Sequence, residues 1–407
     1  MANKILTPQV YANTMLKLLK NNLVMGKLVT TKYNSEFKKV GDTIDVKRPP
    51  EFVVREGRVA QIQDVVVGSV PVKLDKQRGV DIEFDSVEET LSVDQLLMDE
   101  TMNSKAATLA QEIDSCLAEA TLEFPHWVGT PGETINSVAD FFKAPKRMDQ
   151  LALPGGGRSG IMDPEDYWDT AQQFTNGNIY DNNVNMTALQ RAKLPVIGNV
   201  QPYMSQSVPY LTTGTRTNGT VDGANQNVNY VDVAEGYTQT INVAGLGAGG
   251  TVKKGEVFTI ANVRAVNPRT KATQTFLQMF VVLEDATADG TGDAQLKIAN
   301  PIISSGAYQT VNAAPANGAA VTWMGTAGST YPVNSVFRKE SIALTFAKLT
   351  RPRSGEYAYS TDPQTGVTIR YWQASDAVND VHMHRWDVLF GVSNVDRRQG
   401  VRMSGTA

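Results

Sequence analysis

The sequence predicts an α+β fold into which an all-β module is inserted. An amphipathic pattern over residues 92–124 indicates a long helix, and alternating strand patterns flank it along the chain. From about residue 195 to 330, charge is sparse and Thr, Asn, Gly and Val dominate. After about residue 335 the chain returns to the character of its first half. An insertion into an α+β domain is the simplest arrangement that explains this order.

Composition narrows the class of protein. The chain has 407 residues, 41 % hydrophobic and 20 % charged, enough for about two to three globular domains. No apolar stretch reaches the roughly 18 residues of a membrane-spanning helix. The N-terminus lacks the apolar core of a signal peptide, so we expect synthesis and folding in a cytoplasm. The single Cys116 excludes an intrachain disulfide and is expected to be a small buried thiol. A net charge of −4 argues against a free-standing nucleic-acid binder.

The N-terminal segment combines a helix with a basic bias. Residues 7–28 have loosely helical apolar spacing, and Thr7-Pro8 fits an N-cap followed by a first-turn proline. The first fifty residues carry 9 Lys and Arg against 3 acidic residues. Such an arm either contacts an acidic partner or is simply solvated. The candidate partner contacts are Lys17, Lys20 and Lys27.

Residues 40–78 predict a long, partly exposed hairpin. Pro49-Pro50 cannot lie inside a central strand. The hairpin carries interleaved charges of both signs, which could guide a neighbouring molecule into register. These candidate contacts are Arg55, Glu56, Arg58, Lys73, Asp75, Lys76 and Arg78. Beyond them, Val80, Ile82 and Phe84 alternate with acidic residues, as in a strand with one wet face.

Four further segments have helical patterns. In the longest, Ser92 and Gln95 fit a capping box, and small apolar residues then recur every three or four positions up to about residue 124. Further helices are expected at about 135–151, after Asp163-Pro164, and over residues 335–349. The inserted region instead shows short strands separated by Gly, Asn and Asp turns, which argues for a barrel or sandwich. These strands are YTQTINVAG, EVFTIANVRAV, QTFLQMFVVLED, AQLKIANPI and AAVTWMGT.

Motifs for chemistry are weak. Gly245, Gly247 and Gly250 match a dinucleotide fingerprint in spacing, but a strand pattern follows them where a helix is needed, so a hairpin tip is expected. Similarly, the glycines at 155–157 indicate a turn. His382 and His384 share a strand face and could ligate a metal, yet a third ligand is lacking and structural roles are favoured. We therefore expect no enzyme, no metal and no cofactor.

The order of these pieces resembles the major capsid protein of tailed phages, which has the Hong Kong 97-type fold. VGDTIDVKRP and the strands after it are similar to the projecting hairpin called the E-loop, and residues 92–124 resemble the spine helix. GIMDPEDYWD resembles a helix start of the axial domain, and VLFGVSNVDRRQGVRM the closing strands. The β-rich region is similar to the β-barrel insertion of short-tailed P-22 type coat proteins.

The resemblance implies domain boundaries. The expected parts are an arm at 1–34, an E-loop at 35–78, a peripheral domain at 79–150, a first axial part at 151–228, an inserted β-barrel at 229–332 and a closing segment at 333–407.

The implied function is assembly. Copies would form pentamers and hexamers and close into an icosahedral virion shell around double-stranded DNA, with a scaffolding protein and a portal as partners. The inserted domain would brace subunits, and assembly would take place in the bacterial cytoplasm. Three alternatives remain: a β-rich tail, decoration or binding protein, a cellular encapsulin-type shell protein, and a metal-dependent enzyme using His382 and His384. The long helix followed by an α+β core favours a shell subunit over a decoration module.

Overall fold

A computed structural model describes residues 8–36, 43–55, 57–60, 62–85, 100–175, 194–376 and 378–406. The chain divides into two compact units. The first comprises residues 1–44, 72–117 and 342–393, and the second comprises residues 45–71, 118–341 and 394–407. Neither unit is a continuous stretch of sequence, so each is completed by segments that are far apart in the chain.

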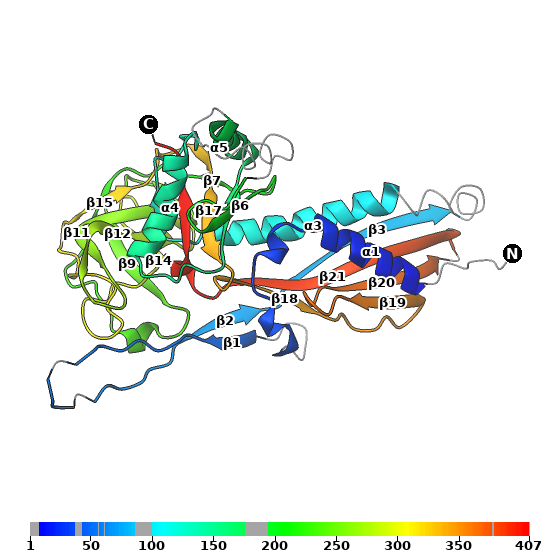
Figure 1. Cartoon of the computed structure of the whole chain (residues 1–407), viewed down its shortest axis with the longest axis horizontal. Helices are drawn as coiled ribbons and strands as arrows, with labels where there is room; N and C mark the ends of the chain where they lie inside the picture. The colour runs from blue at the N-terminus through cyan, green and yellow to red at the C-terminus, as the bar shows by residue number, and fades with distance from the viewer. Residues whose placement is uncertain are drawn as a thin grey trace. The chain divides into compact units, whose positions relative to one another are not determined.

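The first unit is a sheet covered on one face by two helices (Figure 1). Its strands are ordered β18-β21-β20-β19, and β3 also pairs with β21. The helices are α1 (Pro8–Asn22) and α3 (Glu100–Thr121), and short 3-10 turns follow α1 at Met25–Lys27 and Lys32–Glu36. The strands are β3 (Lys76–Asp85), β18 (Ile342–Ala347), β19 (Glu356–Thr361), β20 (Thr368–Asp376) and β21 (Val381–Asn394).

Aromatic side chains attach both helices to the same sheet face. Tyr371 and Trp386 lie directly opposite each other in the β20–β21 pairing. Tyr11 of α1 stacks on Tyr371 at 5.4 Å, and the ammonium of Lys105 in α3 lies 4.2 Å from the Trp386 ring centroid. Because cross-strand partners point to one face of a sheet, α1 and α3 must cover that face together.

The second unit contains a mixed sheet ordered β4-β22-β17-β5-β6. Helix α4 (Val138–Gln150) begins at the N-cap Ser137, whose hydroxyl accepts from the Asp140 N–H at 3.1 Å. Its apolar face, with Phe141 and Met148, packs in one cluster with Val336 of the sheet. Helix α5 (Pro164–Thr175) follows β5. The strands are β4 (His126–Val128), β5 (Arg158–Met162), β6 (Val200–Met204), β17 (Asn334–Arg338) and β22 (Gly400–Met403).

A closed barrel with the order β11-β12-β14-β9-β8-β15 lies within the second unit. Alternating buried residues of its strands form one core that includes Phe258, Phe280 and Ile298. The barrel strands are β8 (Gly219–Val221), β9 (Thr238–Ala244), β11 (Val257–Val266), β12 (Thr273–Val282), β14 (Ala294–Ala299) and β15 (Ala320–Trp323). Smaller pairs join β10 (Thr251–Val252) with β13 (Ala286–Thr287), and β7 (Tyr210–Thr212) with β16 (Thr330–Pro332).

The barrel, the α+β class and most expected elements are therefore confirmed, but one expected helix is wrong. Residues 335–349 were expected to be a helix, but they form β17 and β18. Four of the five residues in β17 and five of the six in β18 are buried, so neither strand shows the alternation that marks a half-exposed strand. A short, continuous apolar run does not distinguish a buried strand from a buried helix. Residues 92–99 of the expected long helix lie outside the described residues.

Candidate assembly surfaces

A long loop joins β1 (Thr43–Lys47) to β2 (Ser69–Lys73), which form a two-stranded sheet (Figure 1). Within residues 48–68 the described part contains no strand. At the base, the Arg48 N–H donates to the Gly68 carbonyl at 2.8 Å. The Gln63 amide bridges the two arms, accepting from the Val53 N–H at 2.9 Å and donating to the Val53 carbonyl at 2.7 Å. The loop therefore has an internal structure although no sheet continues through it.

The same loop exposes a strip of large apolar side chains. Ile62 is 95 % exposed and Val54 is 86 % exposed. A monomeric protein rarely leaves so many apolar groups in water on one segment, and such surfaces mark interaction sites. The strip, here called the loop strip, consists of Phe52, Val53, Val54, Val59, Ile62, Val65 and Val67.

The charged residues expected to make contacts fall into two separate groups. Arg55 and Arg58 are exposed on the loop, where the Arg55 guanidinium donates to the Gly57 carbonyl and, at 3.2 Å, to that of Val59. Glu56 lies outside the described residues. The other group surrounds the β2–β3 junction and consists of Lys73, Asp75, Lys76 and Arg78. Of these, Arg78 pairs with Glu112 of α3 at 2.7 Å, and both side chains are nearly half exposed.

The three candidate lysines of the N-terminal region differ in environment. Lys17 is exposed and makes no ion pair with the described part of the chain. Lys20 is an internal contact, since its ammonium lies 3.1 Å from the Asp362 carboxylate of the turn after β19. Lys27 is exposed, and its ammonium donates to the Asn21 carbonyl at 3.4 Å. Only Lys17 and Lys27 thus present their charge mainly to solvent.

A partly buried ion network lies at the base of the loop in the second unit. The Arg398 guanidinium bonds to Glu51 at 2.9 Å and to Asp396 at 3.1 Å, while Arg48 lies 3.8 Å from Asp396. The Arg48 guanidinium also stacks 3.7 Å from the Tyr237 ring centroid. Burial opposes ionisation of Asp396, but the charges of Arg398 and Arg48 outweigh it and lower the pKa of this carboxyl. The carboxylate is therefore fixed in its charged form.

A related cluster centres on Glu123, which follows α3. Its carboxylate pairs with Arg397 at 2.8 Å and with Lys254 at 2.9 Å. Burial would raise the pKa of Glu123, yet these two cations lower it to about 2. The segment Asp396-Arg397-Arg398 thus supplies cations to two networks at once.

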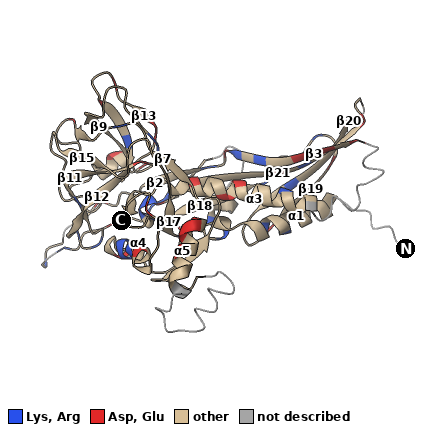
Figure 2. Cartoon of the chain, turned by 90° about the horizontal axis from the view of Figure 1, so that it is seen from above, with Lys and Arg blue, Asp and Glu red and all other residues tan. Residues whose placement is uncertain are grey.

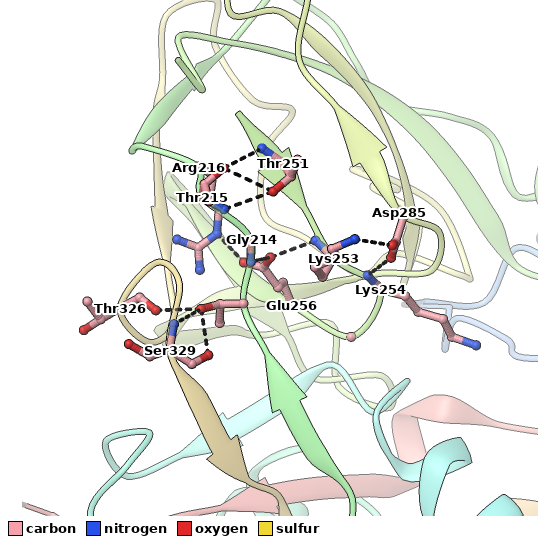
Figure 3. A network of polar contacts seen from close by, with 12 residues as sticks. Gly214, Thr215, Arg216, Thr251, Lys253, Lys254, Glu256, Asp285, Thr326 and Ser329 are labelled. Atoms are coloured by element: carbon pink, nitrogen blue, oxygen red, sulfur yellow. Dashed lines mark hydrogen bonds and ion pairs between the residues drawn. The ribbon is translucent and has the colours of Figure 1, made fainter. Parts of the chain in front are cut away.

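Polar contacts close the end of the barrel where the chain enters and leaves (Figure 3). Glu256 is fully buried, pairs with Arg216, and accepts from the N–H groups of Gly214 at 2.7 Å and Lys253 at 2.8 Å. Beside it, Lys253 pairs with Asp285 at 2.8 Å. A buried pair of this kind needs all its hydrogen bonds to offset the loss of water. The network holds the connecting segments in register with the barrel.

The motifs weighed for chemistry have structural roles. Gly245 and Gly247 have positive φ and form the turn between β9 and β10. The expected hairpin tip is wrong, because β9 pairs with β8 and β14 whereas β10 pairs with β13 in a separate sheet. The His384 ring bonds to the Tyr371 hydroxyl at 2.7 Å, and His382 bonds to Ser375 at 2.7 Å. Among the residues that the structure describes, no three His, Cys, Asp or Glu side chains are grouped as a metal site. Cys116 is buried, as predicted.

The sequence reasoning emphasised the charges of the loop and missed its apolar strip. The signal was present in the runs FVV at 52–54 and VVV at 65–67, beside a Pro-Pro pair that excludes a regular central strand. Apolar runs in a segment that cannot join a core must be exposed or covered by another molecule. The ion networks at the loop base carried no comparable signal, since Glu51 and Arg398 are 347 residues apart and Glu123 and Arg397 are 274 apart.

The loop with its apolar strip, the helix-covered sheet and the inserted barrel correspond to the parts expected of a coat protein with the Hong Kong 97-type fold. No helix among the described residues has the length and hydrophobicity to cross a membrane. The family model described as P22 coat protein, gene protein 5, matches residues 1–405, so the chain belongs to the P22 coat protein family. It is a major capsid protein, a virion component whose copies form an icosahedral shell.

Solved structures give distant likenesses. A structure from Mycobacterium phage Che8 is 9 % identical, with a TM-score of 0.47, covering 93 % of this chain and 90 % of that one. The capsid structure of cyanophage P-SCSP1u is 9 % identical, with a TM-score of 0.44 and coverage of 100 % and 92 %. The CUS-3 coat protein I-domain is 28 % identical over 28 % of this chain and 98 % of that one, with a TM-score of 0.21. No curated protein matches the sequence significantly.

Proposed function

We propose that the loop strip joins neighbouring subunits of the shell, which is built from pentamers and hexamers and encloses the double-stranded DNA of a tailed phage. The observation that carries this proposal is the exposure of seven large apolar side chains on residues 48–68. Covering one such side chain completely contributes about 1.5–3 kcal/mol. Because every subunit carries the strip, the contribution is repeated throughout the shell.

The charged residues have a different task in this proposal. Arg55 and Arg58 are exposed on the same loop, and exposed ion pairs contribute only about 0–1 kcal/mol each. They orient the loop during encounter more than they hold it. Weak polar contacts beside an apolar strip allow a misplaced subunit to dissociate before the shell closes.

Substituting Ile62→Asp tests the strip. The side chain is almost fully exposed in the subunit, so the fold should tolerate the change while the contact loses an apolar anchor. We expect normal circular dichroism and thermal unfolding, but few or no closed shells by light scattering and electron microscopy. Val231→Asp, at a position 67 % exposed in the turn before β9, is the matched control and should assemble normally. Normal shells from Ile62→Asp would contradict the proposal.

The solvent-facing cations of the N-terminal region are proposed to bind an acidic scaffolding protein or a neighbouring subunit. A charge reversal at Lys20 would break its pair with Asp362, so the informative variant is Lys17→Glu with Lys27→Glu. This variant should keep its fold and fail to assemble with scaffold. Lys339→Glu, at another exposed lysine, serves as the control. Shells of normal number and size from the double variant would reject this role.

The remaining parts of the proposal follow from capsid function. The inserted barrel braces the subunit and its neighbours, a portal occupies one vertex, and assembly takes place in the bacterial cytoplasm. The protein has no enzymatic activity in this account. A mildly acidic chain, with a net charge of −4, suits a container that must release its DNA, because a strongly basic inner wall would retain it.

A further inference from the structure

A cavity of about 400 Å³ lies in the second unit between α4, β4 and β12. One wall is formed by α4, and the other by Phe276 and Met279 of β12. Trp127 of β4 forms part of the lining and is almost completely buried. The cavity is thus built from elements of both the mixed sheet and the barrel, and it takes no part in the loop strip.

The α4 wall is basic. Lys143, Lys146 and Arg147 line the cavity, and the spacing of three and four residues places them along one side of the helix. None of the lining residues is acidic. The basic residues of α4 can be followed in Figure 2.

These three cations are incompletely neutralised. Lys143 pairs with Asp140 at 2.7 Å, whereas Lys146 is exposed and has no ion pair with the described residues. In Arg147 the atom Nη1 is buried without a hydrogen-bond partner in the described part of the chain. Burial lowers the pKa of Arg147 to about 10, as expected for a guanidinium held away from water and from a counter-charge. A buried donor without a partner is unfavourable. Because Nη1 is closed to solvent, an anion in the cavity would act on the Arg147 guanidinium through its charge and would bond directly to the exposed Lys146 ammonium.

Apart from Gln150, Thr275 and Gly129, the remaining lining is apolar and aromatic. The Arg147 guanidinium lies 3.7 Å from the Phe276 ring centroid, which fixes its orientation. Met279 and Met324 add flexible apolar surface that adapts to different side chains. A concave site with apolar walls and a basic rim suits a short polypeptide segment, in which a carboxylate and an apolar side chain are neighbours. The phosphates of a duplex lie on its convex outside and would leave these apolar walls uncovered.

We propose that this cavity binds an acidic, apolar peptide segment of another polypeptide. One carboxylate of the segment bonds to Lys146 beside the Arg147 guanidinium, and an adjoining apolar side chain packs between Phe276 and Met279. The site is independent of the loop strip, so shell assembly through the loop and peptide binding here can fail separately.

The test uses the full-length chain, kept unassembled as judged by light scattering. The probe is a fluorescein-labelled peptide, Leu-Glu-Asp-Leu-Glu-Glu-Leu, and its affinity is measured by fluorescence anisotropy. A second peptide, with Gln and Asn in place of Glu and Asp, has the same shape without the charge. We expect the acidic peptide to bind about tenfold more tightly than the amide peptide, with an affinity that falls as salt rises.

Variants assign the binding to the cavity. Lys146→Glu should weaken binding of the acidic peptide about tenfold, while Lys339→Glu, at an exposed lysine outside the cavity lining, should leave it unchanged. Lys146→Gln removes the charge without reversing it and should have an intermediate effect. Circular dichroism of each variant checks that weaker binding is not caused by a folding defect. Equal binding of both peptides, equal loss in Lys339→Glu, or displacement of the acidic peptide by duplex DNA of the same charge would each overturn the proposal.

Discussion

At the scale of single residues, buried charges set the sensitivity of this protein to substitution and pH. Glu256 has no exposed surface. Its carboxylate pairs with Arg216 and accepts hydrogen bonds from two backbone N–H groups. Removing one partner of a buried pair leaves the other uncompensated, which typically destabilises by about 3–5 kcal/mol. We therefore expect Glu256→Gln to reduce the free energy of unfolding by about that amount in urea titrations.

The control for this substitution is Glu284→Gln. Glu284 pairs with Lys297, but its side chain is 64 % exposed. Exposed pairs contribute about 0–1 kcal/mol, so this variant should unfold almost as the parent does. A similar loss from both substitutions would mean that burial of the Arg216–Glu256 pair is not the cause.

Lys105 should make stability rise at alkaline pH. Its side chain is buried against Trp386, and burial lowers its pKa to about 8 from 10.5. Between these two values the unfolded chain binds a proton that the native chain does not, so the free energy of unfolding increases with pH. Below about pH 8 both states are protonated and the contribution is constant.

The variant Lys105→Met removes the titrating group. It should stabilise the chain by about 1–2 kcal/mol at pH 7 and flatten the rise between pH 8 and 10 in urea unfolding. Lys17→Met, at an exposed lysine of α1, should change neither quantity. An unchanged pH profile in Lys105→Met would assign the alkaline rise to other groups.

At the scale of elements, a close backbone approach constrains β21. An added Cβ at Gly391 would lie 1.9 Å from the carbonyl oxygen of Lys73, which is main chain and cannot swing away. We expect Gly391→Ala to destabilise by at least about 2 kcal/mol, because the strand or the segment beside it must shift. Gly290→Ala, where nothing lies within 4 Å, should be nearly neutral. Thermal unfolding of the two variants gives the comparison.

The elements also show how far the sequence could be interpreted. The buried stripe of α3, which includes Met102, Leu109 and Ile113, follows the predicted spacing, because a long helix shows its period over many turns. Five of the six barrel strands were predicted from turn residues and alternation, whereas the three-residue β8 was not. In contrast, β17 and β18 are short and buried almost throughout, so the strand period was hidden and a helix was expected. A long helix shows its period in the sequence. A strand that is covered on both faces by other elements shows no alternation, and the sequence of the strand alone does not reveal that cover.

The surfaces could be predicted only in part. The loop was located from Pro49-Pro50 and its charges. The exposure of Ile62 and Val54 could not be predicted, because it depends on whether another part of the chain packs against them. Lys20 could not be separated from Lys17 by charge, since its partner Asp362 lies 342 residues away. The expected domain boundaries, including a start of the inserted domain at residue 229, stay predictions.

At the scale of the whole molecule, the barrel is attached through two adjacent strands. β7 pairs with β16, and the Thr213 N–H donates to the Ser329 carbonyl at 2.9 Å. A short glycine linker from Thr213 to Ser329 would therefore remove the barrel without stretching the remaining chain. If the barrel braces the subunit, this deletion should give low soluble yield or malformed assemblies by sedimentation and electron microscopy. Shells of normal size from the deletion variant would show that bracing is not its role.

The measurement that tests the whole account most directly is electron microscopy of the full-length chain, expressed alone and together with its genomic neighbours, beside light scattering. Membership of the P22 coat protein family and the exposed loop strip predict closed shells or rings the size of pentamers and hexamers. A discrete monomer in both preparations, with its apolar loop in solvent, would contradict the account.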